Sequence, residues 1–282
     1  MSTNIKKYQL NNEMVWMGDL SKIDGKIQSK PTRFVIRPLN VNDAEQMGEL
    51  SQKIYSHLKD GEECFIHKHS KEYYYDVFEN PNIHYIGVFV GKNLVGMSYL
   101  KICQNKEELQ EELPNSNYDF FKNNNTNTRI ASFGADCVLP AFRGNSLNAI
   151  MIDYRFNLAS NLNCTDCTSI VDRNNRWNMT PYFANRFNLF STAIDPSDNG
   201  KISLLHKPMG HDSVLSNKKT RISIPYNRFE LIDKMISRGF IGVDFDKTNA
   251  SVTFAHSSFY VSKEHAPANI LDFAPYRNVF SM

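Results

Sequence analysis

The sequence predicts a mixed α/β fold in which strands and helices follow one another along a single chain. Three observations lead to this class: short strand-like apolar runs, other segments with apolar residues every three or four positions, and two strands around a tight turn. The 282 residues are 41% hydrophobic and 12% aromatic, which is enough to bury a sizeable core. We therefore expect a globular chain.

The first half of the chain predicts a strand, two helices and a hairpin. Residues 34–37 form an apolar strand, and helical spacing over 47–58 makes the first amphipathic helix. A second helix is expected over 70–78. The runs 85–90 and 94–100 flank a short turn that contains glycine, so we expect them to pair as an antiparallel hairpin.

The second half continues the same alternation. Residues 130–139 form a strand that Pro140 stops, and apolar residues then recur on one helical face from Leu147 to Leu158. After these come the strand 168–171, the helix 175–187, and the strands 202–205, 221–224, 241–245 and 252–261, with a helix over 227–238 that Gly239 closes.

Composition excludes several classes of protein. The 32 Lys and Arg nearly balance the 30 Asp and Glu, and the net charge of +2 gives no field that would attract nucleic acid or a membrane surface. No apolar run approaches the roughly 20 residues of a membrane helix, and the first residues do not read as a signal peptide. Five scattered cysteines make no disulfide framework, so we expect a cytoplasmic protein.

The most informative segment runs from Cys137 to Asn148, off a strand, through a turn, and into a helix. A helix that begins after such a turn leaves its first N–H groups unpaired, with the positive end of the helix dipole behind them. This geometry suits a phosphate or a pyrophosphate.

This segment resembles the acyl-CoA loop of the GCN5-related N-acetyltransferase (GNAT) superfamily, whose motif is (Q/R)-x-x-G-x-(G/A). Arg143 takes the first position, while Ser146 and Asn148 stand where the family has small residues. A second family pattern, N-x-x-A-x-x-L-Y-x-x-x-G-F, is matched by Asn175, Tyr182 and Phe187. The order of elements over about residues 33–209 is also similar to that family.

The resemblance implies a GNAT-like, mostly antiparallel central sheet flanked by helices, and a division of the chain. Residues 1–31 would be an N-terminal arm, 32–210 a GNAT-like acyltransferase domain, and 211–282 a C-terminal extension. The implied reaction transfers an acetyl or other acyl group from acyl-CoA to an amine, on a small molecule or a protein, without a metal. The extension is where a homodimer would form.

The resemblance also implies site residues. The main chain of Val138 and Leu139 would hold the pantetheine, and the pyrophosphate would lie on the turn, with Asn175 as a further cofactor contact. The turn residues are Arg143, Gly144, Asn145, Ser146, Leu147 and Asn148.

Two residues are the catalytic candidates. Tyr182 would protonate the departing thiolate, and Asp136 would accept the proton of the amine, because strand alternation puts its side chain on the face of Val138. The alternatives are a core tyrosine with a satisfied hydroxyl, and an aspartate that caps a neighbouring helix or pairs with an arginine. His84 is a weaker base, and Cys137 a conceivable acyl carrier.

Other features have a structural and a functional interpretation. Cys164 and Cys167 have metal-ligand or redox spacing, but no second cysteine pair accompanies them, so a zinc site is not expected. Residues 104–122 carry five acidic residues against two lysines, and this insert would either steer a cationic acceptor or form a solvated helix and loop.

Two rival functions remain open at this point. One is an N-acyl amino acid or autoinducer-type synthase supplied by an acyl carrier protein, because an altered pyrophosphate loop matters less when the donor has no nucleotide. The other is a non-catalytic GNAT-like module that binds a ligand or a partner.

Overall fold

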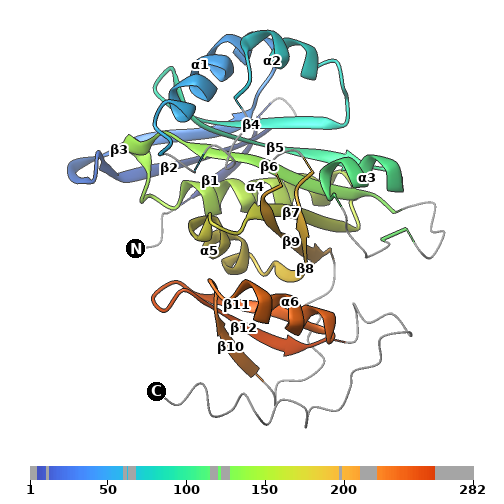
Figure 1. The fold of residues 1–282 in the computed structure, drawn as a ribbon. Helices are drawn as coiled ribbons and strands as arrows, with labels where there is room; N and C mark the ends of the chain where they lie inside the picture. Colours follow the sequence, from blue (N-terminus) through green and yellow to red (C-terminus); the bar gives the residue numbers. More distant parts are fainter. Residues whose placement is uncertain are drawn as a thin grey trace.

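The computed structural model describes residues 5–10, 13–59, 62, 68–114, 120–121, 128–196, 199–209 and 221–257. These segments build one twisted sheet with helices on both faces (Figure 1). Within the described residues, no helix is both long enough and apolar enough to cross a membrane.

The sheet contains twelve strands among the described residues, in the order β1-β2-β3-β4-β5-β6-β7-β9-β8-β11-β12-β10. Neighbouring strands run antiparallel except β6 and β7, which are parallel. The strands are β1 (Lys6–Leu10), β2 (Glu13–Ile23), β3 (Lys26–Pro38), β4 (Ile83–Val90), β5 (Asn93–Cys103), β6 (Ile130–Val138), β7 (Asp166–Asp172), β8 (Asn188–Ile194), β9 (Lys201–Pro208), β10 (Arg221–Pro225), β11 (Phe240–Asp246) and β12 (Ser251–His256). The mixed, mostly antiparallel sheet that the sequence predicts is thereby confirmed.

Six α-helices cover the sheet in the described part of the chain: α1 (Ala44–Tyr55), α2 (Lys71–Val77), α3 (Lys106–Glu112), α4 (Leu147–Asn161), α5 (Arg176–Ala184) and α6 (Phe229–Ser237). Apolar side chains of α1, α2 and α3 pack on one face. Those of α4, α5 and α6 pack on the other face. Alternation along the strands supplies both cores, as Leu204 and Leu205 of β9 illustrate by facing opposite ways.

Both ends of the described chain belong to the sheet. Trp16 and Leu20 of β2 are fully buried beside α4, so much of the expected N-terminal arm is part of the central sheet. At the other end, β11 pairs with β8 through Gly242 and Leu189. The boundaries expected at 31 and 210 therefore do not interrupt the sheet, although the β10–α6–β11–β12 unit lies at its far edge in Figure 1.

Strand β8 is not among the elements that the sequence predicts. Residues 188–194 lie between α5 and β9 and form the inner partner of β9, with Leu189 and Phe190 buried on opposite faces. The strand begins with Asn188 and contains a Ser-Thr pair, so its sequence shows no clear alternation of apolar and polar residues. The helix closed by Gly239 is present as α6, and Gly239 has a φ of 82°.

The parallel pair β6–β7 positions the site. The two strands are paired from Ile130 with Asp166 to Phe133 with Ser169, and β6 then continues to Val138 without pairing to β7. A bulge near Ala135, which has a φ of 51°, accompanies the change in register against β5. The last residues of β6 therefore have one edge to which no other strand of the described residues pairs.

Candidate active site

A cleft of about 730 Å³ opens beside this uncovered edge of β6. Its walls are the end of β6, the turn after it, the first turn of α4, and one side of α5. The end of α1 and Lys247, in the turn between β11 and β12, also line it. The cleft is thus lined by residues from both halves of the chain. The strand order alone does not show that these residues lie together.

Most of the predicted cofactor residues line this cleft. They are Val138, Arg143, Gly144, Ser146, Leu147, Asn148 and Asn175. Asn175 stands at the N-cap position of α5, but its side chain makes no capping hydrogen bond.

The first turn of α4 has the features of an anion site. Ser146 precedes the helix with a φ of 59°, and the first intrahelical bond of the main chain runs from the Ile150 N–H to the Ser146 carbonyl. The N–H groups of Leu147, Asn148 and Ala149 therefore have no acceptor within the helix, and all three residues line the cleft. Gly144 has a φ of 81°, and no atom lies within 4 Å of the position that a Cβ would take there, so its surroundings are open.

Asn145 takes a different role from the predicted one. Its side chain is 6% exposed, and its Oδ1 accepts hydrogen bonds from the N–H groups of Ser21 and Lys22 at 3.0 and 3.1 Å. Its Nδ2 donates to the Lys22 and Phe142 carbonyls at 2.8 and 2.9 Å. These bonds tie the turn to β2 and to its own Phe142, and Asn145 is not among the residues that line the cleft.

Leu139 also differs from the prediction. Its N–H donates to the Val95 carbonyl at 2.9 Å and its carbonyl accepts from the Phe142 N–H at 2.9 Å, so neither group is free for a pantetheine. Because N–H groups alternate across a strand, the main-chain groups of Val138 point to the opposite, uncovered edge. There the Val138 carbonyl accepts a hydrogen bond from Arg143 Nε at 3.0 Å.

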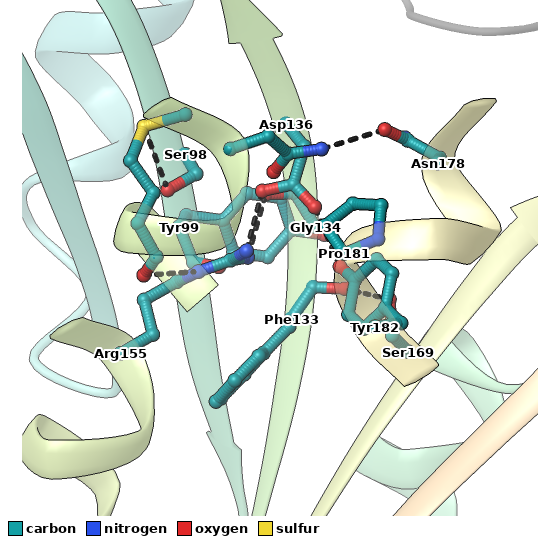
Figure 2. A network of polar contacts seen from close by, with 12 residues as sticks. Ser98, Tyr99, Phe133, Gly134, Asp136, Arg155, Ser169, Asn178, Pro181 and Tyr182 are labelled. Atoms are coloured by element: carbon teal, nitrogen blue, oxygen red, sulfur yellow. Dashed lines mark hydrogen bonds and ion pairs between the residues drawn. The ribbon is translucent and has the colours of Figure 1, made fainter. Parts of the chain in front are cut away.

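The two catalytic candidates lie together, but they bind each other. The Tyr182 hydroxyl donates to Asp136 Oδ2 at 2.5 Å, and Arg155 pairs with Asp136 Oδ1 (Figure 2). Tyr182 is 1% exposed, the Asp136 side chain 3% and the Arg155 side chain 0%. Arg155 also donates to the carbonyls of Tyr99 and Gly134 at 3.0 and 3.3 Å.

This network gives both residues structural partners. Burial raises the pKa of Tyr182 well above its usual value, and the adjacent Asp136 carboxylate raises it further. Burial also raises the pKa of Asp136, against the opposing effects of Arg155 and of the Tyr182 hydrogen bond. A hydroxyl committed to a carboxylate, and a carboxylate held by an arginine, match the structural alternatives left open for these residues.

The remaining candidates also lie in structural settings. Cys137 faces the α1–α2 core, away from Asp136 as alternation predicts, and burial raises the pKa of its thiol to about 12. Burial raises the pKa of Cys164 to about 11, and Cys167 Sγ lies 3.5 Å from Met209 Sδ. Burial lowers the pKa of His84 in β4, which does not line the cleft. In the part of the chain that the structure describes, no three His, Cys, Asp or Glu side chains gather as metal ligands.

The acidic insert is partly neutralised where the structure describes it. Lys101 Nζ lies 2.7 Å from Glu111 Oε2 and 3.3 Å from Glu112 Oε1, and Tyr99 donates to Glu112 at 3.0 Å. Glu108 accepts from the Gln104 N–H at 2.8 Å. Asp119 lies outside the described residues. Steering of a cationic acceptor by this insert stays a prediction.

Sequence reasoning missed three residues of the cleft. Glu62 lies beyond α1, Trp177 is the second residue of α5, and Lys247 comes from the C-terminal extension. No motif marks them, and their distances along the chain hide their proximity. Trp177 is the one with a detectable signal, because a lone tryptophan amid polar residues at the start of a helix is unusual for a core position.

No model of a protein family matches this chain, and no curated protein matches it. It is similar to solved structures at low identity: NAA60 of Arabidopsis thaliana in complex with acetyl-CoA (16% identity, TM-score 0.48, 63% of this chain and 99% of that one) and a GNAT-family acetyltransferase from Streptococcus pneumoniae (11%, 0.48, 63% and 99%). The PaiA N-acetyltransferase from Thermoplasma acidophilum in complex with coenzyme A is a third (18%, 0.43, 62% and 98%).

These likenesses concern the fold, and what the cleft can do depends on this chain's own residues. The turn from β6 into α4 lies where the sequence predicts it. The chain has the mixed α/β, mostly antiparallel sheet that is expected from its sequence.

Proposed function

We propose that this chain is an N-acyltransferase that moves an acyl group from acyl-CoA directly to an amine. The observation that carries the proposal is the continuity of one cleft from the uncovered edge of β6 to the unpaired N–H groups of α4. Acyl-CoA is a long molecule, with a thioester at one end and a pyrophosphate towards the other. It needs a strand edge beside the thioester arm and an anion site for the pyrophosphate, both in one groove.

The pyrophosphate end is the first turn of α4. Its free N–H groups and the helix dipole favour an anion, and Arg143 adds a formal positive charge at the cleft wall. Ser146 and Asn148 add side chains where the family motif has small residues. They crowd the approach but leave the main-chain N–H groups in place.

The pantetheine would lie along β6 and hydrogen-bond to Val138. For this, Arg143 Nε has to leave the Val138 carbonyl, to which it is bonded at 3.0 Å. A phosphate offers the guanidinium a charged acceptor in exchange for a neutral one, and charge-assisted hydrogen bonds are the stronger kind. Binding of the donor would therefore release the strand edge and engage Arg143 in one event.

The amine end would be the part of the cleft next to α1, lined by Ile54, Leu58 and Glu62. Glu62 Oε2 accepts a hydrogen bond from the Lys59 N–H at 3.0 Å, which leaves its other carboxylate oxygen for an ammonium group. We assign to Glu62 the binding of the amine and the acceptance of its proton. A carboxylate at this part of the cleft supports an amine as the acceptor.

Asp136 and Tyr182 would act as positioning residues. With Arg155 they hold β6 against α4 and α5 where β6 separates from β7, and so fix the strand edge that the thioester has to meet. Precise placement of two reactants is itself a large part of the catalysis of a two-substrate transfer.

The test is calorimetric titration of the full chain with acetyl-CoA and with longer acyl-CoAs. Micromolar binding is expected, and Asn148→Asp should abolish it because a carboxylate then faces the pyrophosphate across the first turn of α4. Asn161→Asp, the same substitution on the exposed last residue of that helix, is the matched control and should bind as the natural chain does. If no CoA ester binds to the natural chain, the proposed function is lost.

The role of Glu62 has its own test. Glu62→Gln should lower turnover at saturating donor by about a hundredfold, within the usual range for loss of a general base, and leave calorimetric binding of acetyl-CoA unchanged. Glu45→Gln, at an exposed position in the first turn of α1, is the control. A fully active Glu62→Gln protein would remove Glu62 from the reaction.

A further inference from the structure

The outer part of the cleft contains an exposed tryptophan beside two cations. Trp177 is 62% exposed although it is the largest kind of apolar side chain. Arg176 Cζ lies 4.8 Å from the centre of its ring system, and Lys247 Nζ lies 6.0 Å from it. Trp177 and Lys247 both line the cleft that contains the first turn of α4.

Lys247 reaches the cleft because the C-terminal extension is fixed to α5. Phe245 of β11 stacks on Phe183 of α5 with ring centres 6.1 Å apart, and both are buried in the same core. Arg173, after β7, pairs with Asp233 of α6. In Figure 1 the β11–β12 turn accordingly lies next to α5, on the side of the molecule away from α1.

The turn that carries Lys247 is held by its own hydrogen bonds. Asp246 Oδ1 accepts from the N–H groups of Thr248 and Asn249 at 2.8 and 3.2 Å, and Asp246 Oδ2 accepts from Asn249 Nδ2 at 2.6 Å. These bonds fix the main chain on both sides of Lys247. The main chain of Lys247 is therefore held in place, and only its side chain is free to move.

An aromatic face with cations beside it suits a particular ligand chemistry. An indole ring offers a stacking surface to a purine, and a lysine or arginine offers a charge-assisted hydrogen bond to a phosphate. The cleft carries formal positive charges from Arg143 and Lys247, and of its two carboxylates Asp136 is paired with Arg155 while Glu62 follows α1. The combination fits a purine nucleotide that bears a phosphate beyond the pyrophosphate.

We propose that Trp177 and Lys247 form a subsite for the adenosine 3′-phosphate portion of acyl-CoA, with the C-terminal extension as a built-in part of the donor site. The inference rests on the proposed function and adds to it a preference between two kinds of acyl donor. A donor attached to a carrier protein has the pantetheine and one phosphate but no adenosine, so it makes no contact with this subsite. The subsite therefore favours acyl-CoA over acyl carrier protein.

The experiment compares three ligands that differ at this end: CoA, dephospho-CoA without the 3′-phosphate, and 4′-phosphopantetheine without the nucleotide. Calorimetry of the natural full chain should give CoA about tenfold tighter binding than dephospho-CoA. Lys247→Ala should weaken CoA about tenfold and leave dephospho-CoA unchanged, so that the preference disappears. Lys234→Ala, on an exposed position of α6 in the same extension, should keep the preference.

Trp177→Ala separates stacking from charge. It should weaken both CoA and dephospho-CoA and leave 4′-phosphopantetheine unchanged. The subsite is overturned if the natural chain binds CoA and dephospho-CoA equally, or if Lys247→Ala retains the preference, while acyl transfer from acetyl-CoA continues. If none of the three ligands binds and no transfer occurs, the proposed function fails instead, and the subsite with it.

Discussion

Two networks in this molecule join an arginine, an aspartate and a hydroxyl, and they differ in burial. Arg155, Asp136 and Tyr182 lie inside the sheet–helix core, with both charged side chains at most 3% exposed. Arg173, Asp233 and Thr192 attach α6 to the sheet, and there the Asp233 side chain is 46% exposed. The first is beside the cleft and the second is at the base of the C-terminal extension.

The two networks use the same kinds of side chain, but they differ in how strongly they hold their elements together because they differ in burial. A buried charge without its partner is very costly, so the first network strongly fixes where β6, α4 and α5 meet. A half-exposed carboxylate can be solvated, so the second network holds the extension more weakly. The wall that the extension contributes to the cleft is therefore expected to be the more easily displaced one.

The largest effect is expected from breaking the buried network. Asp136→Asn leaves the Arg155 charge without a counterion at 0% exposure, and should lower the free energy of unfolding by about 3–5 kcal/mol. Urea denaturation followed by circular dichroism measures it. A loss below about 1 kcal/mol would show that the carbonyls of Tyr99 and Gly134 suffice to hold Arg155.

The next effect concerns the hydroxyl of the same network. Tyr182→Phe leaves one Asp136 oxygen without its donor and should cost about 2 kcal/mol, the range for hydrogen bonds to charged groups. If Tyr182 is a positioning residue, turnover falls by less than tenfold and the pH profile of turnover keeps its shape. A loss of a hundredfold or more, with a changed alkaline limb, would restore Tyr182 as the proton donor.

The matched substitution in the exposed network should have a smaller effect on stability. Asp233→Asn is expected to lower the free energy of unfolding by about 1–2 kcal/mol: water reaches the Asp233 side chain, which is 46% exposed, but the Arg173 side chain, 3% exposed, loses its counterion. Limited proteolysis should nevertheless cut the C-terminal extension faster than in the natural chain. Equal losses for Asp233→Asn and Asp136→Asn would contradict the role given to burial.

A third pair, of intermediate exposure, has a defined pH dependence. Arg37 donates to both oxygens of Asp43 at 2.8 Å. Burial raises the pKa of Asp43, but the hydrogen bonds from Arg37 and from the Asn40 N–H outweigh it, and the pKa lies below its usual value. A lowered carboxyl pKa gives stability that is present above the unfolded-state pKa of about 3.9 and is lost as pH falls through the folded-state pKa.

Asp43→Asn should therefore be less stable than the natural chain at pH 6, by under about 1 kcal/mol, and this difference should shrink towards pH 2. Denaturant unfolding at the two pH values is the measurement. A difference that stays constant with pH would mean that the Asp43 charge contributes nothing and that the loss is one of packing.

Much of the fold could be predicted from local pattern. Apolar periodicity located α1, α4 and the β4–β5 hairpin, because these elements bury one clear face or flank a short turn. It missed β8, whose place is decided by pairing with β9 and β11 rather than by its own composition. The long β3 was recognised over its last residues alone, since its first half is exposed and polar.

The site divides in the same way. The turn from Arg143 to Asn148 was identified because a strand, a turn and a helix start are consecutive in the chain, and local order suffices to build them. The contacts of Asn145 with Ser21 and Lys22 join positions more than 120 residues apart, so they could not be predicted. The bonds that join Asp136 to Arg155 and to Tyr182 could not be predicted either, because the three residues come from different elements of the fold.

By itself, the sequence determined the class of fold, the turn between β6 and α4, and the face on which Asp136 lies, since all three follow from the spacing of neighbouring residues. The tertiary structure alone decided that Asp136 binds Arg155 and Tyr182, that Glu62 lies at the cleft, and that Lys247 completes its outer wall. These depend on how far β6 and β7 stay paired and on how the extension packs against α5. Such long-range packing leaves no periodic signal in the chain.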